Sequence, residues 1–479
     1  MQVQEQKPGF AERLRKAGGS VYFIGIGGIG MSALARYFHA HGISVHGYDR
    51  TATPLTQQLE SEGIHIHYQE AVDLIPTDVQ LVIFTPAIRT ENQELRYMQK
   101  QGYTLYKRSD VLQQITNSSL NICVAGTHGK TTISSMTGHL LRHSGFGCNA
   151  FLGGIAVNYG SNFWSSYNNV TVVEADEYDR SFLKLHPYIA IITSMDPDHL
   201  DIYGTAAAME EAFIAFSKQV QSEGWLIVKY GLSRIHELRA EQRISYHLSH
   251  SDADVHTTSV NVVNGCYEFD VQIKLPGKSA HTITGLRLQA GGLHNVENLL
   301  PAITVAYLLG VSDNKIKEAV TAYQGVKRRF EYVLAPGEGS VVLIDDYAHH
   351  PEELRALISG VRNLFKGYQL LLVFQPHLFS RTRDLATDFA AQLDTADAVL
   401  LLPIYAAREL PIPGVESNSI LQQMQLGAKA LVVKENLLNA IEEQVQQLKN
   451  KGKQVVVVTA GAGDIDAFLP ALKSILKKI

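Results

Sequence analysis

The sequence is poor in the features that would place it in several common classes of protein. It has only three cysteines among 479 residues, Cys123, Cys148 and Cys266, and none forms a CxxC pair. This spacing favours neither a disulfide framework nor a zinc knuckle, so we interpret them as reduced thiols. No run approaches the ~18 apolar residues of a membrane helix. The polar, charged N-terminal stretch lacks the apolar core of a secretory signal.

The sequence also lacks a strong excess of one charge. Its formal net charge is -5, which argues against a nucleic acid or a membrane surface as partner. No low-complexity tract and no repeat of 20–50 residues stands out. We therefore expect a soluble, cytoplasmic protein that acts on small molecules. The sequence leaves the oligomeric state open, and our expectation is a monomer or weak homodimer.

Short β-branched runs alternate with longer segments of helical spacing, which is typical of parallel α/β sheets. At roughly 150 residues per domain, the length favours about three domains. We predict three consecutive α/β domains: a Rossmann-like domain at 1–118, a P-loop ATPase-like domain at 119–331, and a second Rossmann-like domain at 332–479. In the central domain, the turn-rich stretch from about 242 to 290 predicts appended antiparallel strands.

The first glycine-rich loop, GIGGIG at residues 25–30, satisfies the GxGxxG pattern between a predicted strand and a predicted helix. Its glycines let backbone N–H groups approach a diphosphate at a helix N-terminus. The candidate ligand-binding residues are Gly25, Gly27, Gly28, Gly30 and Asp49. A dehydrogenase would hold a ribose with this acid, but a nucleotide-diphosphate sugar fits the loop equally well.

A second loop, GTHGKTT at 126–132, also follows a predicted strand and precedes a predicted helix. Val124 stands where the usual ATP loop has its first glycine, and His128 lies inside the loop. Lys130 offers a compact positive charge to phosphate oxygens, and the Thr131 hydroxyl suits magnesium. The candidate nucleotide-binding residues are Gly126, Thr127, His128, Gly129, Lys130, Thr131 and Thr132.

Acidic residues follow the next two predicted strands. Glu174 ends one strand, with Asp176, Glu177 and Asp179 after it, and the stretch SMDPDHLDIYG follows another. Magnesium prefers oxygen ligands, so two acidic strand ends beside a phosphate loop predict a cation site. A solvated acidic loop is the alternative for each residue taken singly.

Two further polar stretches follow apolar strands in the third predicted domain: DDYAHHP at 345–351 and QPHLFSRTRD at 375–384. An arginine such as Arg381 can hold a carboxylate through two hydrogen bonds, although a surface salt bridge is an equal alternative. A zinc site is disfavoured, because the adjacent His349 and His350 point apart on most backbones.

These motifs together resemble the Mur ligases, which build the peptide stem of bacterial cell-wall precursors. The resemblance runs in order through GIGGIGMS, GTHGKTT, EADEYDRSFL, DPDHLDIYG, GLHNVENLLPAI, GVKRRFEYV, DDYAHHP and QPHLFSRTRD. It implies an ATP- and Mg²⁺-dependent ligase of peptidoglycan synthesis. The closest match is the ligase that joins L-alanine to the carboxylate of UDP-N-acetylmuramate through an acyl phosphate.

The resemblance also implies roles for single residues. Lys130 would contact the ATP phosphates, Thr131 and Glu174 would hold magnesium, and His199 would bind a second magnesium. The adenine side would be held by His294, Asn295 and Asn298, with Arg329 near the interdomain hinge. Asp346 would contact ATP, while Tyr347, His349 and Arg381 would serve the amino acid, with His349 or Asp346 as the base. Family members often have arginine where this chain has Leu378.

Three other functions stay open at this point. A murein-peptide recycling ligase shares most of the motifs, although it tends to carry a longer insertion after the segment matching ADEYDRSFL. A dehydrogenase would use the first loop and Asp49 but leaves the second loop unexplained. A nucleotide-binding regulatory module would use the second loop without joining two substrates.

Overall fold

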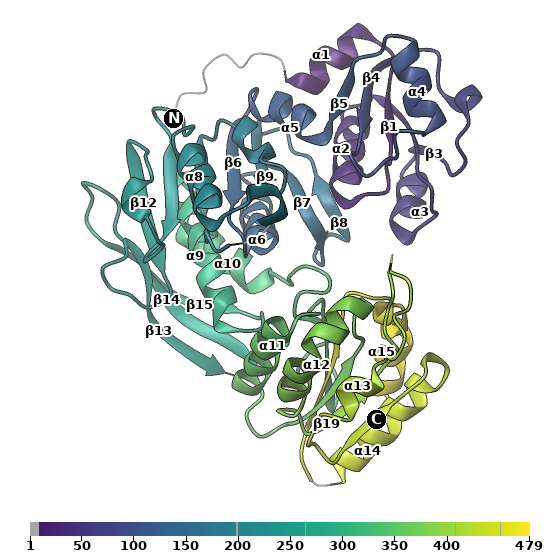
Figure 1. Ribbon diagram of the computed structural model, residues 1–479. Coiled ribbons are helices and arrows are strands. Elements are labelled where there is room, and N and C mark those ends of the chain that lie inside the picture. Colours follow the sequence, from purple (N-terminus) through teal and green to yellow (C-terminus); the bar gives the residue numbers. More distant parts are fainter. Residues whose placement is uncertain (1–8, 198–199, 264, 408, 451) are drawn as a thin grey trace. The chain divides into compact units, whose positions relative to one another are not determined.

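The computed structural model describes residues 9–197, 200–263, 265–407, 409–450 and 452–479, with residues 200 and 201 described as backbone only. The described residues form three β-sheets with helices packed against them (Figure 1). They fall into two compact units: the first lies within Met1–Thr258, Asp270–Leu286 and Glu297–Ala322, and the second within Ser259–Phe269, Arg287–Val296 and Tyr323–Ile479. The α/β fold class is confirmed, whereas the boundaries at 118/119 and 331/332 stay predictions.

The first sheet is a five-stranded parallel sheet in the order β3-β2-β1-β4-β5. Its strands are β1 (Ser20–Ile24), β2 (Ser44–Tyr48), β3 (His65–His67), β4 (Val79–Phe84) and β5 (Leu105–Lys107). Its helices are α1 (Phe10–Ala17), α2 (Ile29–Ala40), α3 (Pro54–Ser61), α4 (Gln93–Lys100) and α5 (Arg108–Thr116). All five residues of β1 are buried, as expected for a central parallel strand.

The central sheet has ten strands in the order β15-β14-β13-β12-β11-β10-β6-β9-β7-β8. The first five of its strands along the chain are β6 (Leu120–Ala125), β7 (Asn149–Ala156), β8 (Ser161–Trp164), β9 (Val170–Glu174) and β10 (Ile189–Ile192). The others are β11 (Trp225–Lys229), β12 (Gln242–His247), β13 (Val255–Val263), β14 (Cys266–Ile273) and β15 (His281–Leu288). The helices are α6 (Lys130–His143), α7 (Leu200–Tyr203), α8 (Ala206–Ser217), α9 (Leu293–Leu308) and α10 (Asp313–Ala322).

One detail of the central sheet differs from the sequence-based expectation. The strands expected between about 242 and 290 are present, but β12 pairs in parallel with both β11 and β13 rather than starting an antiparallel patch. Parallel pairing requires a crossover between strands, and the segment from Tyr230 to Glu241 supplies one between β11 and β12. Thus β12 continues the parallel core instead of forming an appendage.

The third sheet has six strands in the order β16-β17-β21-β18-β19-β20, and β16 is its one antiparallel member among the pairs described. The strands are β16 (Glu331–Leu334), β17 (Val341–Asp346), β18 (Gln369–Phe374), β19 (Ala398–Leu401), β20 (Lys429–Leu431) and β21 (Val455–Ala460). The helices are α11 (Pro351–Leu364), α12 (Phe379–Leu393), α13 (Asn418–Leu421), α14 (Leu437–Lys449) and α15 (Leu469–Leu476). Every residue of β21 is buried, which explains its unbroken apolar sequence.

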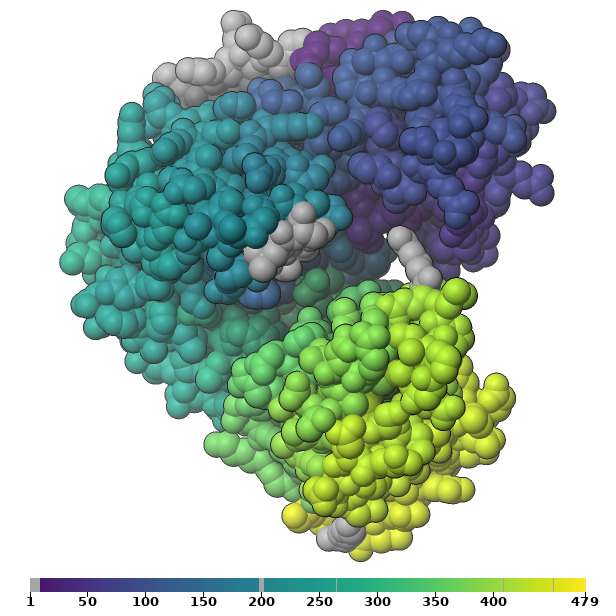
Figure 2. All heavy atoms as spheres, viewed as in Figure 1, coloured from purple at the N-terminus to yellow at the C-terminus, as the bar shows by residue number. Residues whose placement is uncertain are grey.

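Within the first unit, α2 packs against β7 and β8 of the central sheet. The Arg36 guanidinium, 5% exposed, binds both carboxylate oxygens of Glu62 at 2.7 and 2.8 Å and donates to the Asn162 side chain. Figure 2 shows the purple and blue atoms of the N-terminal domain against the teal atoms of the central one. This contact fixes the first glycine loop relative to the central sheet.

Among the described residues, no helix combines the length and the apolar character that crossing a membrane requires.

Candidate active site

The second glycine loop joins the end of β6 to the start of α6. Gly129 caps α6 in the left-handed region at φ +83°, and Gly126 has φ +130°. A Cβ at Gly126 would lie 2.0 Å from the Thr193 hydroxyl oxygen, so a side chain there would collide with the end of β10. The loop is also held by Ser194, whose hydroxyl oxygen lies 2.7 Å from Thr127 Oγ1 and accepts the His128 N–H at 2.9 Å.

Lys130 begins α6 and turns its ammonium group back over the loop. Its Nζ donates to the Gly126 carbonyl at 2.8 Å and forms an ion pair with Glu177 Oε1 at 2.6 Å. The Glu177 side chain is fully buried, and its backbone carbonyl accepts the Tyr203 hydroxyl at 2.6 Å. Burial raises the pKa of Glu177, and the charge of Lys130 opposes that shift. The sequence alone did not identify this internal counter-ion.

The predicted magnesium ligands lie on neighbouring elements. Thr131 is 8% exposed at the start of α6, and Glu174 ends β9. Ser134 Oγ lies 3.1 Å from the Thr131 carbonyl and 3.2 Å from Glu174 Oε1, which also accepts the Gly153 N–H at 2.7 Å. Hydroxyl and carboxylate oxygens are the donors that magnesium prefers, so these residues fit the ion.

The second acidic stretch is only partly described. His199, the expected ligand of a second magnesium, lies outside the described residues, as does Asp198. Asp196 Oδ2 lies 3.8 Å from His128 Nε2, and both side chains are more than 60% exposed. A pair this exposed contributes little to stability.

The predicted adenine-side residues belong to the start of α9. Asn298 lies against the phosphate loop, because a Cβ at Gly129 would be 3.0 Å from Asn298 Oδ1. Asn295 is 8% exposed and donates from Nδ2 to the Gly291 carbonyl at 2.5 Å, while His294 is exposed. His294 and Asn295 fall in the second compact unit and Asn298 in the first.

The first glycine loop joins β1 to α2, and Asp49 holds its shape. The Gly27 N–H donates to Asp49 Oδ2 at 2.7 Å, and the Thr51 N–H donates to Oδ1 at 3.2 Å. Gly25 has φ +88°, where glycine is the residue without a steric penalty. Gly28 and Gly30 line a cavity of about 370 Å³.

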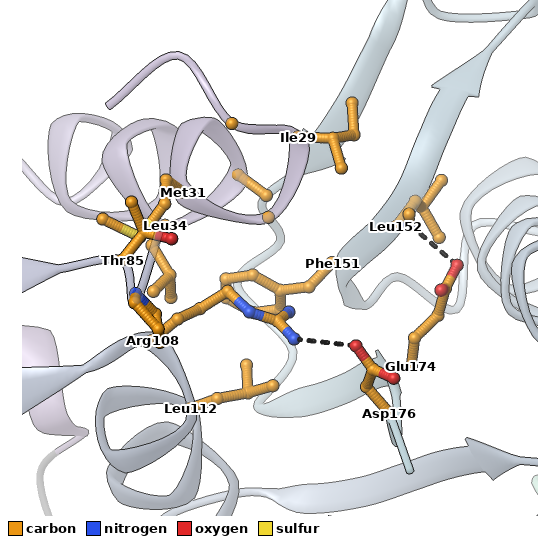
Figure 3. Close-up of a pocket in the computed structure, with 15 residues that line it drawn as sticks. Ile29, Met31, Leu34, Thr85, Arg108, Leu112, Phe151, Leu152, Glu174 and Asp176 are labelled. Atoms are coloured by element: carbon orange, nitrogen blue, oxygen red, sulfur yellow. Dashed lines mark hydrogen bonds and ion pairs between the residues drawn. The ribbon is translucent and has the colours of Figure 1, made fainter. Parts of the chain in front are cut away.

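This cavity reaches from the first glycine loop to the end of β9, and Figure 3 shows its lining. Glu174 and Asp176 border it from the central domain, and Arg108 from the start of α5. Leu34, Leu112 and Phe151 are among its apolar lining residues. One cavity therefore borders both the candidate diphosphate loop and a candidate magnesium ligand. Arg108 was not singled out from the sequence.

In the second unit, two adjacent acids end β17. Asp346 accepts the N–H groups of Phe330 and Ala348, both at 2.7 Å, and burial raises its pKa to about 6. Asp345 is fully buried, accepts the Thr459 hydroxyl at 2.5 Å, and has a pKa raised by burial to about 7. No sequence motif assigned a role to Asp345.

The expected hinge arginine, Arg329, is exposed, whereas the preceding Arg328 is the one bound into this unit. Arg328 has φ +59° and donates from Nη1 to the Gly463 carbonyl at 2.9 Å. Its Nε lies 3.5 Å from Asp345 Oδ2, and its guanidinium lies 5.1 Å from the Tyr347 ring centre. Which of two adjacent arginines is bound to the protein depends on the backbone turn, which the sequence did not reveal.

The predicted amino-acid residues gather between β17 and α12. The His349 ring centre lies 5.1 Å from that of Tyr347 and 5.7 Å from that of His377. Arg381 Nη1 donates to His377 Nδ1 at 3.3 Å, and the Tyr405 ring stacks on His377 at 5.8 Å. Burial, with the charges of His349 and Arg381, lowers the pKa of His377. His377 and Tyr405 are additions to the predicted set.

Leu378 precedes α12 with φ +71°, a conformation that a branched side chain rarely adopts. Its N–H donates to the Tyr405 carbonyl at 3.0 Å, and its carbonyl accepts the Thr382 hydroxyl at 2.9 Å. These bonds hold the turn that presents Arg381. The turn at residue 378 is therefore held by hydrogen bonds of its backbone groups, and it forms with leucine at the position where family members often have arginine.

Family models match the chain in three consecutive stretches. Residues 20–119 match the Mur ligase family catalytic domain, 124–306 the Mur ligase middle domain, and 328–463 the Mur ligase glutamate ligase domain. A protein of Parabacteroides distasonis is 44% identical over 469 residues, which cover 96% of this chain and 97% of that protein. The chain belongs to the Mur ligase family.

The relatives point to one member of that family. The Parabacteroides distasonis protein is named UDP-N-acetylmuramate–L-alanine ligase, as is a Porphyromonas gingivalis protein that is 44% identical over 96% of this chain and 99% of its own length. The crystal structure of UDP-N-acetylmuramate-alanine ligase from Thermotoga maritima matches with a TM-score of 0.78 and 26% identity, covering 95% and 99% of the two chains. A murein peptide ligase from Psychrobacter arcticus, at 22% identity over 96% and 99% with a TM-score of 0.63, shares the fold.

Proposed function

We propose that this Mur ligase joins L-alanine to the carboxylate of UDP-N-acetylmuramate, with conversion of ATP to ADP and phosphate. The product is UDP-N-acetylmuramoyl-L-alanine, a precursor of peptidoglycan. The names of the relatives that match nearly the whole chain support this substrate pair. Use of ATP follows from membership of the family, and magnesium is part of the proposal.

The observation that carries the proposal is the cavity that connects the first glycine loop with Glu174, a candidate magnesium ligand of the ATP site. Gly28 and Gly30 line it at one side and Glu174 at the other, while Ser134 links Glu174 to Thr131 in the phosphate loop. A sugar nucleotide whose diphosphate sits at the first loop would thus extend its acid toward the ATP phosphates. A dehydrogenase has no use for the second loop.

A carboxylate has no leaving group, so the acid must first be activated. A carboxylate oxygen attacks the γ-phosphorus of ATP, and the bond from this phosphorus to the β–γ bridging oxygen breaks. ADP departs, and the acid is now an acyl phosphate. Lys130 neutralises and orients the phosphates. Thr131 and Glu174 would hold magnesium, which supplies further positive charge when two anions meet. His199, outside the described residues, is the proposed ligand of a second magnesium.

The alanine amine must then attack the acyl phosphate in its neutral, unprotonated form. His349 Nδ1 lies 2.8 Å from the Tyr347 carbonyl, which only accepts, so in the neutral imidazole Nδ1 carries the proton and Nε2 has the lone pair. Nε2 of His349 would take the ammonium proton, and Arg381 would hold the alanine carboxylate. The tetrahedral intermediate then loses phosphate and leaves the amide.

The test is a reconstitution with ATP, Mg²⁺, UDP-N-acetylmuramate and L-alanine, in which each component is omitted once. We expect equimolar ADP and amide product, measured by coupled ADP assay and mass spectrometry, and neither product when any component is missing. Lys130→Met should abolish both, whereas Arg96→Gln, an exposed change on α4, should not.

Two results would contradict the proposal. ADP formation that needs the sugar nucleotide and a tripeptide but ignores free alanine would identify a recycling ligase. ATP hydrolysis that is independent of the sugar nucleotide would favour a regulatory module.

A further inference from the structure

Arg108, the first residue of α5, lies beside the N-terminal turn of α2. A Cβ at Gly30 would be 2.7 Å from Arg108 Cδ and 3.0 Å from its Nη1, so a side chain at position 30 would collide with this arginine. Figure 3 shows the guanidinium inside the cavity, between α2 and the end of β9. The missing side chain at Gly30 therefore makes room for a cation beside the loop.

The partner of Arg108 is a loosely bound carboxylate. Arg108 Nη2 lies 3.6 Å from Asp176 Oδ2, beyond hydrogen-bond length, and the two side chains are 32% and 43% exposed. The other oxygen, Asp176 Oδ1, accepts the Tyr178 N–H at 3.1 Å, so the carboxylate is anchored by its own loop. An arginine has five donors in a planar fork, and this single long contact leaves the fork able to rotate toward another anion.

We propose that Arg108 binds the diphosphate of the sugar-nucleotide substrate, together with the backbone N–H groups at the start of α2, and that Asp176 is the counter-ion which the diphosphate displaces. The inference rests on the proposed function, because it assigns a further binding residue to the same substrate. A guanidinium matches a phosphate through two hydrogen bonds, and the positive end of a helix attracts the same anion.

The surroundings of Arg108 strengthen such a contact. Leu34, Leu112 and Phe151 line the cavity next to it, and a bound sugar nucleotide would exclude water from these apolar walls. Charged hydrogen bonds are worth more where water is excluded. Asp176 provides an opposite charge for the guanidinium, so Arg108 does not depend on the substrate for a counter-ion.

The experiment measures binding directly by titration calorimetry, without ATP or alanine. The probes are UDP-N-acetylmuramate and UDP-N-acetylglucosamine, which share the diphosphate, but only the first carries the carboxylate. Arg108→Gln should weaken both by the same factor, roughly 10- to 100-fold, as expected for a lost charged hydrogen bond. Arg96→Gln makes the same charge change at an exposed position of α4 and should leave both affinities within twofold.

Two further variants keep the test decisive. Arg108→Lys retains the charge without the fork and should weaken both probes by less than Arg108→Gln; if the glutamine variant does not fold, unchanged affinities in the lysine variant overturn the proposal. Asp176→Asn should tighten both probes, because a competing anion is removed, and weaker binding would refute its role as counter-ion.

Two other possible results for Arg108→Gln also bear on the proposal. A loss confined to UDP-N-acetylmuramate would mean that Arg108 binds the carboxylate, and no loss for either probe would mean that it binds neither group; both overturn the proposal. Failure of the proposed function is recognised separately, as an absence of amide product from wild-type protein that binds both probes.

Discussion

Replacing Lys130 by methionine should lower the free energy of unfolding, because it removes the positive charge that pairs with the buried Glu177 carboxylate. The Glu177 side chain is fully buried, and Lys130 Nζ lies 2.6 Å from it. Removing one partner of a buried ion pair leaves an uncompensated charge, which typically costs about 3–5 kcal/mol. The protein can limit this cost by taking up a proton on Glu177.

The largest free-energy cost of protonating Glu177 follows from the ordinary pKa of a glutamate carboxyl group. At pH 7 the solution lies about 2.5 pH units above the ordinary pKa of 4.5 for this carboxyl. Each unit is worth about 1.36 kcal/mol, so protonation costs at most about 3.4 kcal/mol at pH 7 and about 2 kcal/mol at pH 6. A raised pKa in the folded state means that stability falls as pH rises above 4.5, so the defect of Lys130→Met should grow with pH.

The assay is urea unfolding followed by tryptophan fluorescence at pH 6, 7 and 8. The chain has two tryptophans, Trp164 and Trp225, and both lie in strands of the central sheet, so the signal reports on the domain that contains the pair. Lys130→Met with Glu177→Gln should recover most of the loss. Lys184→Met is the matched control, because its Asp110 pair is 33–38% exposed and should be worth at most about 1 kcal/mol. A defect that does not change with pH, or that the double variant does not relieve, would refute the reasoning.

Three other predictions concern separate parts of the molecule. His139 is 1% exposed with a pKa lowered by burial to about 4, so the stability of the central domain should rise by up to about 3 kcal/mol between pH 4 and 6.5, and His139→Gln should flatten that slope in the same unfolding assay. Ser194→Ala leaves the His128 N–H without its acceptor, so it should raise the Kd for ATP several-fold in a calorimetric titration and leave sugar-nucleotide binding unchanged; unchanged ATP affinity would argue against this support of the loop. Arg381→Gln should raise the KM for L-alanine roughly 10- to 100-fold at an unchanged KM for ATP, and an equal rise for both substrates would contradict its proposed role.

The regular strands were predictable because burial and sequence agree there. Val455–Val458 form an unbroken apolar run and are all buried in β21. The edge pair β7 and β8 was not predicted, since its sequence holds Gly153, Gly154 and Gly160 and has little alternation. Pairing with β9 and packing of α2 stabilise these strands, and both are tertiary effects.

In the candidate site, too, some residues were predictable from the sequence and others were not. The two loops carry local motifs, so Lys130 and Gly28 could be named from the sequence. Arg108 lies outside the quoted motifs, whereas Ser194 and His377 lie within quoted stretches that assign them no role. The fold brings Arg108 and Ser194 to the two glycine loops from distant parts of the chain, and the turn before α12 sets His377 beside Arg381. Such roles arise from the packing of elements, which spacing along the chain does not encode.

The hydrogen bonds of Asp49 bear on which ligands the first turn can favour. In proteins that use a nicotinamide dinucleotide, an acid at this position is expected to face the sugar hydroxyls. Here its two oxygens already brace the peptide groups of Gly27 and Thr51. The turn is thus stiffened from within, and each carboxylate oxygen keeps a second lone pair that can accept a hydroxyl group of a bound ligand's pentose.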